Sequence, residues 1–249
     1  MGATRPLLLV SGSGSTRTGI PKHLLGMFDG APLYQRQLEV LRHVFPEPQT
    51  IYMFLPPDAE TDAYLDSLPS GSGDTDRTPE SSQEMDEKQP PVKLLRHITP
   101  SKPGHPPAGP ATQGLLAAYK YDPWANWVVV GCNYPLLPPD AVLHLVANRD
   151  AAPVTCFRLF EGVGGYEPLL GIWAPAALSR LAERFARGHP CPREAARELD
   201  GLVIDAPPGC EWWLAESGTV EDFVAVVEEE KKLGSGLEPV AFEAAREAA

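Results

Sequence analysis

Short apolar runs alternate with stretches of helical periodicity along this chain, and this alternation constrains its fold more than any other feature. Residues 7–10 and 127–130 are continuous apolar runs of the kind that a buried parallel strand shows. The expected strands are residues 7–10, 49–55, 92–98, 127–130, 154–159, 167–173 and 202–204. The expected helices are residues 32–44, 57–68, 111–120, 140–147, 176–187 and 220–233.

Strands that alternate with helices predict a three-layer α/β/α fold with a mostly parallel sheet covered on both faces. We expect a small antiparallel excursion around residues 153–173, where two strands follow each other closely. One domain is expected over residues 1–233, followed by a tail at 234–249. In such sheets ligands bind beyond the carboxyl ends of the strands. The loops after Val10, Ile98 and Val130 are therefore the places to search for a site.

Residues 69–91 form an insert of different composition. Proline is unusually frequent in the whole chain, with 28 residues, roughly twice the common share. The insert contributes several prolines, many polar residues and one large apolar residue, Met85. Because it cannot bury enough surface to offset its ordering entropy, we predict that it is disordered.

The charge balance excludes several kinds of partner. Lys and Arg total 21 against 33 Asp and Glu, a formal net charge of −12. Broad binding to nucleic acid or to an anionic membrane needs an excess of positive charge, so we expect neither. The four cysteines are scattered without a C-x-x-C pair, which predicts reduced thiols and no zinc cluster. Reduced thiols indicate the cytosol or the nucleus, and we expect a cytoplasmic protein. No membrane-length apolar run or signal-peptide core is expected either.

The loop at residues 11–22 follows the first expected strand and carries the strongest chemical signal. Its small residues let backbone N–H groups approach a phosphate, and Arg17 and Lys22 supply positive charge. The loop is neither a Walker loop nor G-x-G-x-x-G. A flexible Gly/Ser connection is the alternative interpretation of the same residues.

This loop resembles the first-strand motif of nucleotidyltransferases with the GT-A-like fold, L-A-G-G-x-S-x-R-M-G-x-x-K. Gly12, Ser15, Arg17, Gly19 and Lys22 fall in register with it. The resemblance continues nearly to the end of the chain and is most similar to the molybdenum cofactor guanylyltransferase branch. Its further matches are Leu24-Leu25, Gly30, Pro32-Leu33, Gly109-Pro110, Gly114, residues 128–135, Glu167-Pro168-Leu169, Thr219 and Glu221-Asp222.

The resemblance implies transfer of a nucleoside monophosphate from an NTP, with release of pyrophosphate. Lys22 would contact the triphosphate, and Arg17 would neutralise charge that builds on the leaving group. These two residues are the implied catalytic pair. The implied nucleotide-binding residues are Val10, Ser11, Gly12, Ser13, Ser15, Lys22, His97 and Gly109. The cofactors and substrates implied are Mg²⁺ and GTP or another NTP, with a molybdopterin-type acceptor.

Several positions depart from the family pattern. The family places a magnesium-binding Asp where Asn133 stands here, and a neutral amide oxygen should hold the ion less well than a carboxylate. Glu216 keeps an acidic group at a second implied metal position. Ser13 replaces a glycine, His97 stands where an Asp contacts the nucleotide, and Gly218 replaces an Asn.

Two functions therefore remain open. One is a nucleotidyltransferase that uses GTP or another NTP. The other is a non-catalytic descendant that binds a nucleotide, a molybdenum cofactor or a protein partner such as a molybdoenzyme maturation protein. Two aromatic residues, Trp212 and Trp213, could offer a ligand platform, but packing in the core or at its edge is the favoured interpretation.

Deletion of residues 70–90 should leave the melting temperature of the protein nearly unchanged, because this part of the insert has almost nothing to bury. Thermal unfolding followed by circular dichroism checks this. A fall of more than a few degrees would show that the insert packs on the domain.

Overall fold

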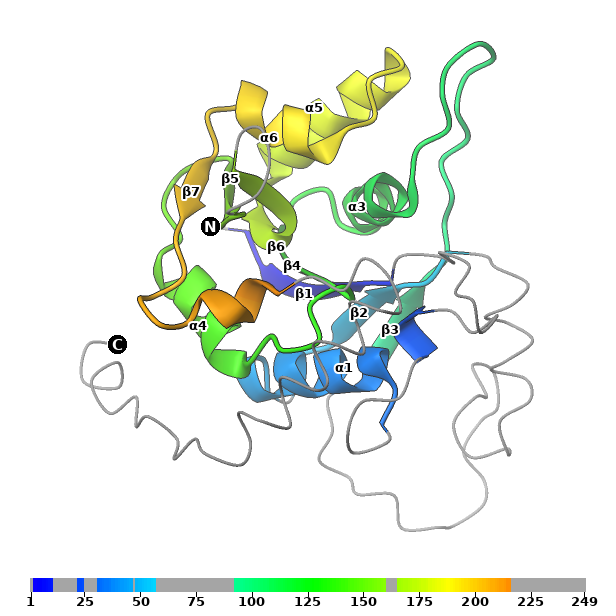
Figure 1. Ribbon diagram of the computed structural model, residues 1–249. Helices are drawn as coiled ribbons and strands as arrows, with labels where there is room; N and C mark the ends of the chain where they lie inside the picture. The colour runs from blue at the N-terminus through cyan, green and yellow to red at the C-terminus, as the bar shows by residue number, and fades with distance from the viewer. Residues whose placement is uncertain are drawn as a thin grey trace, which may run out of the picture.

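The computed structural model describes residues 2–10, 22–24, 31–46, 48–56, 92–159 and 165–215. These residues form one seven-stranded sheet in the order β3-β2-β1-β4-β6-β5-β7 (Figure 1). The strands are β1 (Thr4–Leu9), β2 (Ile51–Phe54), β3 (Val92–Leu95), β4 (Asn126–Gly131), β5 (Val154–Arg158), β6 (Tyr166–Trp173) and β7 (Leu202–Ile204). Among these strands only β6 runs against the others, antiparallel to both β4 and β5.

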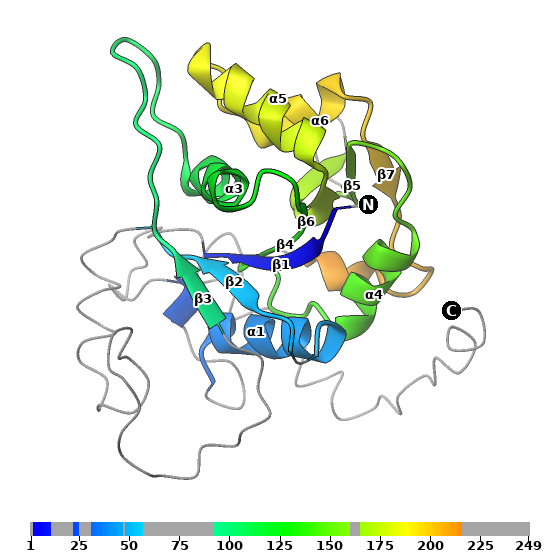
Figure 2. The ribbon, with the colours of Figure 1, turned by 180° about the vertical axis from the view of Figure 1, so that it is seen from behind.

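Helices cover both faces of the sheet, as Figures 1 and 2 show from opposite sides. On one face lie α1 (Leu33–Val44), α4 (Pro139–Ala147) and the 3₁₀ helix η2 (Glu211–Leu214). On the other lie α3 (Pro110–Tyr121), α5 (Pro175–Ala186) and α6 (Pro192–Glu198). The expected three-layer α/β/α fold is confirmed.

The central strands are apolar because both of their faces are buried. Leu8 and Val10 belong to the core beneath α1 and α4, whereas Leu7 and Leu9 belong to the core beneath α3 and α5. All four side chains are at most 2% exposed. Strand β4 is likewise buried over its whole length. A strand buried on both faces needs hydrogen-bonding neighbours on both edges, and β1 has β2 and β4.

The seven expected strands are all present, and the antiparallel excursion consists of β6 alone. Helix α6 was not expected from the sequence, because its seven residues bury only Ala195 and Ala196. The helices expected at 57–68 and 220–233, the insert and the tail lie outside the described residues, so the domain boundaries stay predictions. Trp213 is buried and Trp212 packs against the same core.

All four cysteines are free. None of the helices in the described part of the chain is long and apolar enough to span a membrane.

Gly114 sets how closely α3 approaches the sheet. A Cβ atom at this position would lie 2.2 Å from Cδ2 of Leu9 and 2.9 Å from Cδ1 of Phe54. No side chain therefore fits without displacing residues of β1 and β2.

Gly114→Ala should lower the free energy of unfolding by about 1–3 kcal/mol, the usual cost of overpacking a core. Denaturant unfolding measures this. Gly109→Ala is the matched control, because a Cβ there would meet no atom within 4 Å. Equal stability of the two variants would mean that α3 can shift away from β1 at little cost.

Candidate functional site

The loop after β1 and the turn after β4 emerge side by side. The two strands pair in parallel so that Leu9 lies opposite Gly131. The N–H of Cys132 donates to the carbonyl of Leu9 (2.9 Å), and that of Val10 donates to the carbonyl of Phe54 (3.1 Å). From β1 the sheet continues to β2 on one side and to β4 on the other. Such a switch point at the carboxyl ends of parallel strands is where open α/β sheets bind ligands.

Val10 and Lys22 are the described residues on either side of the first loop. The side chain of Val10 is buried in the core, so only its backbone can face a ligand. Lys22 begins the short 3₁₀ helix η1 (Lys22–Leu24), which contacts α1. Ser11, Gly12, Ser13, Ser15 and Arg17 lie outside the described residues, so their predicted roles stay predictions.

The turn that carries Asn133 is held against α1. Asn133 is half-buried, and Tyr134 beside it is 1% exposed. The carbonyl of Tyr134 accepts a 2.6 Å hydrogen bond from Nε2 of Gln37, a fully buried residue of α1. Burial raises the pKa of the Cys132 thiol well above its usual value, so this neighbour is protonated at neutral pH. Asn133 carries the amide oxygen of this turn.

Gly109 lies at the N-terminal end of α3, and its carbonyl accepts the first helical hydrogen bond from Gln113 (3.0 Å). Because α3 connects the carboxyl end of β3 with the amino end of β4, its N-terminus lies on the same edge of the sheet as Val10 and Asn133. Free N–H groups at such a helix start favour anions.

His97 lies apart from these residues. It follows β3, and β2 separates β3 from β1, so roughly 10 Å of sheet lies between them by strand spacing. Its ring nitrogens lie 3.0 and 3.4 Å from Nζ of Lys120 on α3. The structure therefore places Val10, Gly109 and Asn133 together at the carboxyl ends of the central strands. His97 lies away from them, beside Lys120 of α3. A nucleotide contact by His97 stays a prediction.

A cavity of about 240 Å³ adjoins this edge. It is lined by Ala111, Tyr134, Glu167, Pro168, Leu169, Cys191, Pro192 and Arg193. These residues belong to the turn after β4 and the starts of α3, β6 and α6. The antiparallel course of β6 is what brings the start of this strand to the carboxyl end of β4.

Glu167 and Arg193 provide the charges of this cavity. Glu167 is 3% exposed, and its Oε1 accepts the N–H of Leu169 (2.9 Å). Its Oε2 lies 3.6 Å from the half-exposed guanidinium of Arg193, whose Nε donates to the carbonyl of Tyr166 (3.0 Å). The cavity therefore has a cation at its rim, which suits an anionic group of a ligand.

Helix α6, which carries Arg193, is tied to α5 by ion pairs. Arg184 of α5 is nearly buried and donates to the carboxylates of Glu194 and Glu198. The hydrogen bond from Arg184 holds the pKa of Glu198 below its usual value. Arg193 was not predicted from the sequence, where its signal is slight: Pro192, a residue favoured in the first turn of helices, directly precedes it.

The described residues contain no group of three His, Cys, Asp or Glu side chains that could hold a metal ion. Glu216, the second implied metal position, lies beyond the last described residue.

The fold and this edge of the sheet define an α/β protein of the nucleotidyltransferase class. Residues 7–201 match the family model of the MobA-like NTP transferase domain. The chain belongs to this family. No curated protein sequence matches it.

Solved structures agree on the fold. Molybdopterin-guanine dinucleotide biosynthesis protein A from Archaeoglobus fulgidus is 14% identical, with a TM-score of 0.59 over 91% of this chain and 99% of that one. A cytidylyltransferase from Leptospira borgpetersenii is 14% identical, with a TM-score of 0.57 over 94% and 96%. The manganese complex of Rv0371c from Mycobacterium tuberculosis is 17% identical, with a TM-score of 0.50 over 91% and 99%.

Lys22→Ala should weaken nucleotide binding at least tenfold, about 1.4 kcal/mol, if the first loop cradles phosphates. Titration calorimetry with GTP measures the change. Lys93→Ala is the control, because Lys93 lies at the start of the outer strand β3 and its ammonium contacts Tyr121. Titration curves that do not differ between parent and Lys22→Ala would remove Lys22 from the site.

Proposed function

We propose that this chain transfers a nucleoside monophosphate from an NTP, GTP first among them, to a molybdopterin-type acceptor with release of pyrophosphate. One observation carries the proposal: the turn with Asn133 leaves β4 beside the point where the Arg17 and Lys22 loop leaves β1. The predicted phosphate-binding groups and the predicted metal-binding position would thus begin from neighbouring strand ends.

The chain's own residues would divide the work as follows. Backbone groups from Val10 to Gly12, with Ser13 and Ser15, would approach the base and ribose. Lys22 would hold the triphosphate, while Arg17 would offset the negative charge that grows on the departing pyrophosphate. The start of α3 at Gly109 adds N–H groups that favour an anion nearby.

The cavity beside Asn133 would take the acceptor. It lies between this turn and the start of β6, next to the nucleotide side of the edge. Arg193 would pair with an anionic group of the acceptor through the half-exposed part of its guanidinium, beyond the ion pair that it makes with Glu167. The similarity to the Archaeoglobus fulgidus protein, named for molybdopterin-guanine dinucleotide biosynthesis, supports this choice of acceptor.

Asn133 and Glu216 would hold Mg²⁺. The donor set fits a hard cation in type, because both residues offer oxygen atoms, although the amide of Asn133 is neutral. When bound, the ion would neutralise charge on the phosphates. The Rv0371c neighbour, which was solved with manganese, supports a divalent cation in this fold.

The similarity to a cytidylyltransferase makes CTP the first alternative to GTP. Pyrophosphate release measured with each NTP and molybdopterin distinguishes the two. With an acceptor of this kind, we expect a molybdoenzyme maturation protein as the protein partner and the cytoplasm as the location.

A second candidate is a non-catalytic member of the family that binds a nucleotide, a molybdenum cofactor or a protein partner. The neutral Asn133 at the metal position favours it, as do Ser13 and Gly218. His97 adds to this, because it contacts Lys120 away from the edge of the central strands.

Asn133→Asp should separate the two candidates. If the chain is an enzyme, its activity should demand high Mg²⁺, and Asn133→Asp should raise turnover and lower the Mg²⁺ concentration at half-maximal rate, because an anionic ligand returns to a divalent cation. Pyrophosphate release against Mg²⁺ concentration measures this. Asn148→Asp is the matched control, since it adds the same charge at the C-terminal end of α4.

If neither the parent nor Asn133→Asp turns over, the enzyme proposal is wrong and nucleotide binding without turnover supports the second candidate. Normal turnover of the parent at low Mg²⁺ would instead show that Asn133 does not weaken the metal site.

A further inference from the structure

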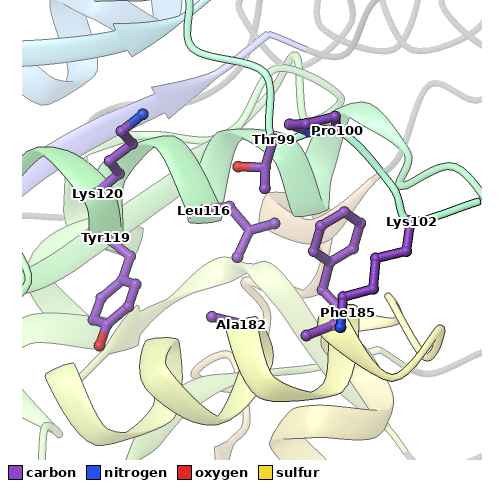
Figure 3. A pocket seen from close by; sticks show the side chains of 9 residues that line it. Thr99, Pro100, Lys102, Leu116, Tyr119, Lys120, Ala182 and Phe185 are labelled. Atoms are coloured by element: carbon purple, nitrogen blue, oxygen red, sulfur yellow. The ribbon is translucent and has the colours of Figure 1, made fainter.

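A second cavity of about 300 Å³ lies between α3, α5 and the segment that follows β3 (Figure 3). It shares no lining residue with the cavity beside Asn133. Its walls are mainly apolar. Leu116 of α3 and Phe185 of α5 are buried, and the small side chains of Ala182 and Ala186 lie one turn apart on α5. These alanines leave room between the two helices where larger residues would fill it.

The third wall of this cavity is fixed in place. The segment contributes Thr99, Pro100 and Lys102. The N–H of Thr99 donates to Oε1 of Gln113 (2.8 Å), and the carbonyl of Thr99 accepts from Nε2 of the same side chain (2.9 Å). Two hydrogen bonds to one amide of α3 hold the segment beside the helix. This wall of the cavity is therefore held in place by hydrogen bonds to α3.

One lysine ammonium lies beside this apolar interior. Figure 3 shows the side chain of Lys102 reaching toward α5, whereas the ammonium of Lys120 points away from the other labelled side chains. The ammonium of Lys120 lies 3.0 Å from the ring of His97 instead. Residues 92–121 contain no Asp or Glu, although the whole chain has 33. A net charge of −12 thus coexists with an acid-free stretch around this cavity.

The acidic side chain next to Ala182 does not cancel this charge. The carboxylate of Glu183 forms a 3.0 Å ion pair with Arg180 and lies 3.6 Å from the guanidinium of Arg187. Its charge is therefore matched on α5 itself. An anionic ligand would meet Lys102 without a competing free carboxylate from this turn of α5.

We propose that this cavity is a second ligand site, which binds an amphipathic organic anion. The apolar or aromatic body of the ligand packs against Leu116 and Phe185, and its acidic group pairs with Lys102. The volume lies at the lower end of small-molecule sites, which suits one or two rings. The strongly negative charge of the chain disfavours long polyanions, so a small ligand with one or two charges is the matching class.

The probe for this site is 8-anilinonaphthalene-1-sulfonate, which carries aromatic rings and one sulfonate. Its fluorescence, titrated with the full-length protein in the presence of saturating GTP, should report saturable binding. N-phenyl-1-naphthylamine has the same rings without the charge and should bind at least several-fold more weakly. Chemical shifts of the Leu116 and Ala182 methyl groups locate the bound probe.

A larger side chain that fills the cavity should strongly weaken probe binding. Ala182→Leu should weaken it at least tenfold, and Ala186→Phe, at an exposed position, is the second occluding variant should the first unfold. Lys102→Ala should weaken binding about three- to fivefold, the usual size of an exposed ion pair. Lys93→Ala is the matched charge control, because Lys93 does not line the cavity.

The proposal is overturned by equal probe binding to the parent and to a folded occluding variant, which would place the probe elsewhere. Displacement of the probe by GTP would assign the signal to the nucleotide edge. Equal affinity for the charged and the neutral probe would contradict the proposed preference of this cavity for an anionic ligand. None of these outcomes depends on whether the chain transfers nucleotides.

Discussion

Parallel pairing of β1 with β2 and β4 is the interaction on which the rest of this structure depends. It satisfies the backbone of a strand whose Leu7 and Leu8 are fully buried on opposite faces. Both helical layers pack against that strand. The same register sets Leu9 opposite Gly131, so the first loop and the Asn133 turn leave the sheet together. A slip of one residue would exchange the two buried faces and separate these groups.

Much of this architecture could be predicted from the sequence, because buried parallel strands are continuous apolar runs and helices have apolar positions at helical spacing. Helix α6 could not, since its seven residues bury little and its place depends on Arg184 of α5. The pairing of β6 with β4 also depends on tertiary packing. The sequence predicts the helix that carries Gln37, but only the fold shows that its amide binds the carbonyl of Tyr134, 97 residues away.

The candidate site was predictable only where a single segment carries it. The first loop and Asn133 each follow one strand, so a motif in the sequence identifies them. Arg193 faces the cavity only because α6 begins there and because antiparallel β6 brings Glu167 to the same place. His97 shows the reverse case. It follows a strand as a site residue should, yet the order of the strands sets β2 between it and the Val10 edge.

Helix α3 forms a wall of both cavities, and its close packing against β1 limits how far the helix can move. Ala111 near its N-terminus lines the cavity beside Asn133, and Leu116 lines the second cavity. Gly114 lies between them and fixes the helix against Leu9 and Phe54. A rigid shift of α3 toward either ligand would therefore open a gap over β1. The segment from Thr99 to Gly109 also joins the two cavities, because it begins at the second cavity, where the Gln113 amide holds Thr99, and ends at the first turn of α3. Helices α5 and α6 form a second connection, because Arg184 of α5 pairs with Glu194 and Glu198 of α6 and each of these helices lines one of the two cavities.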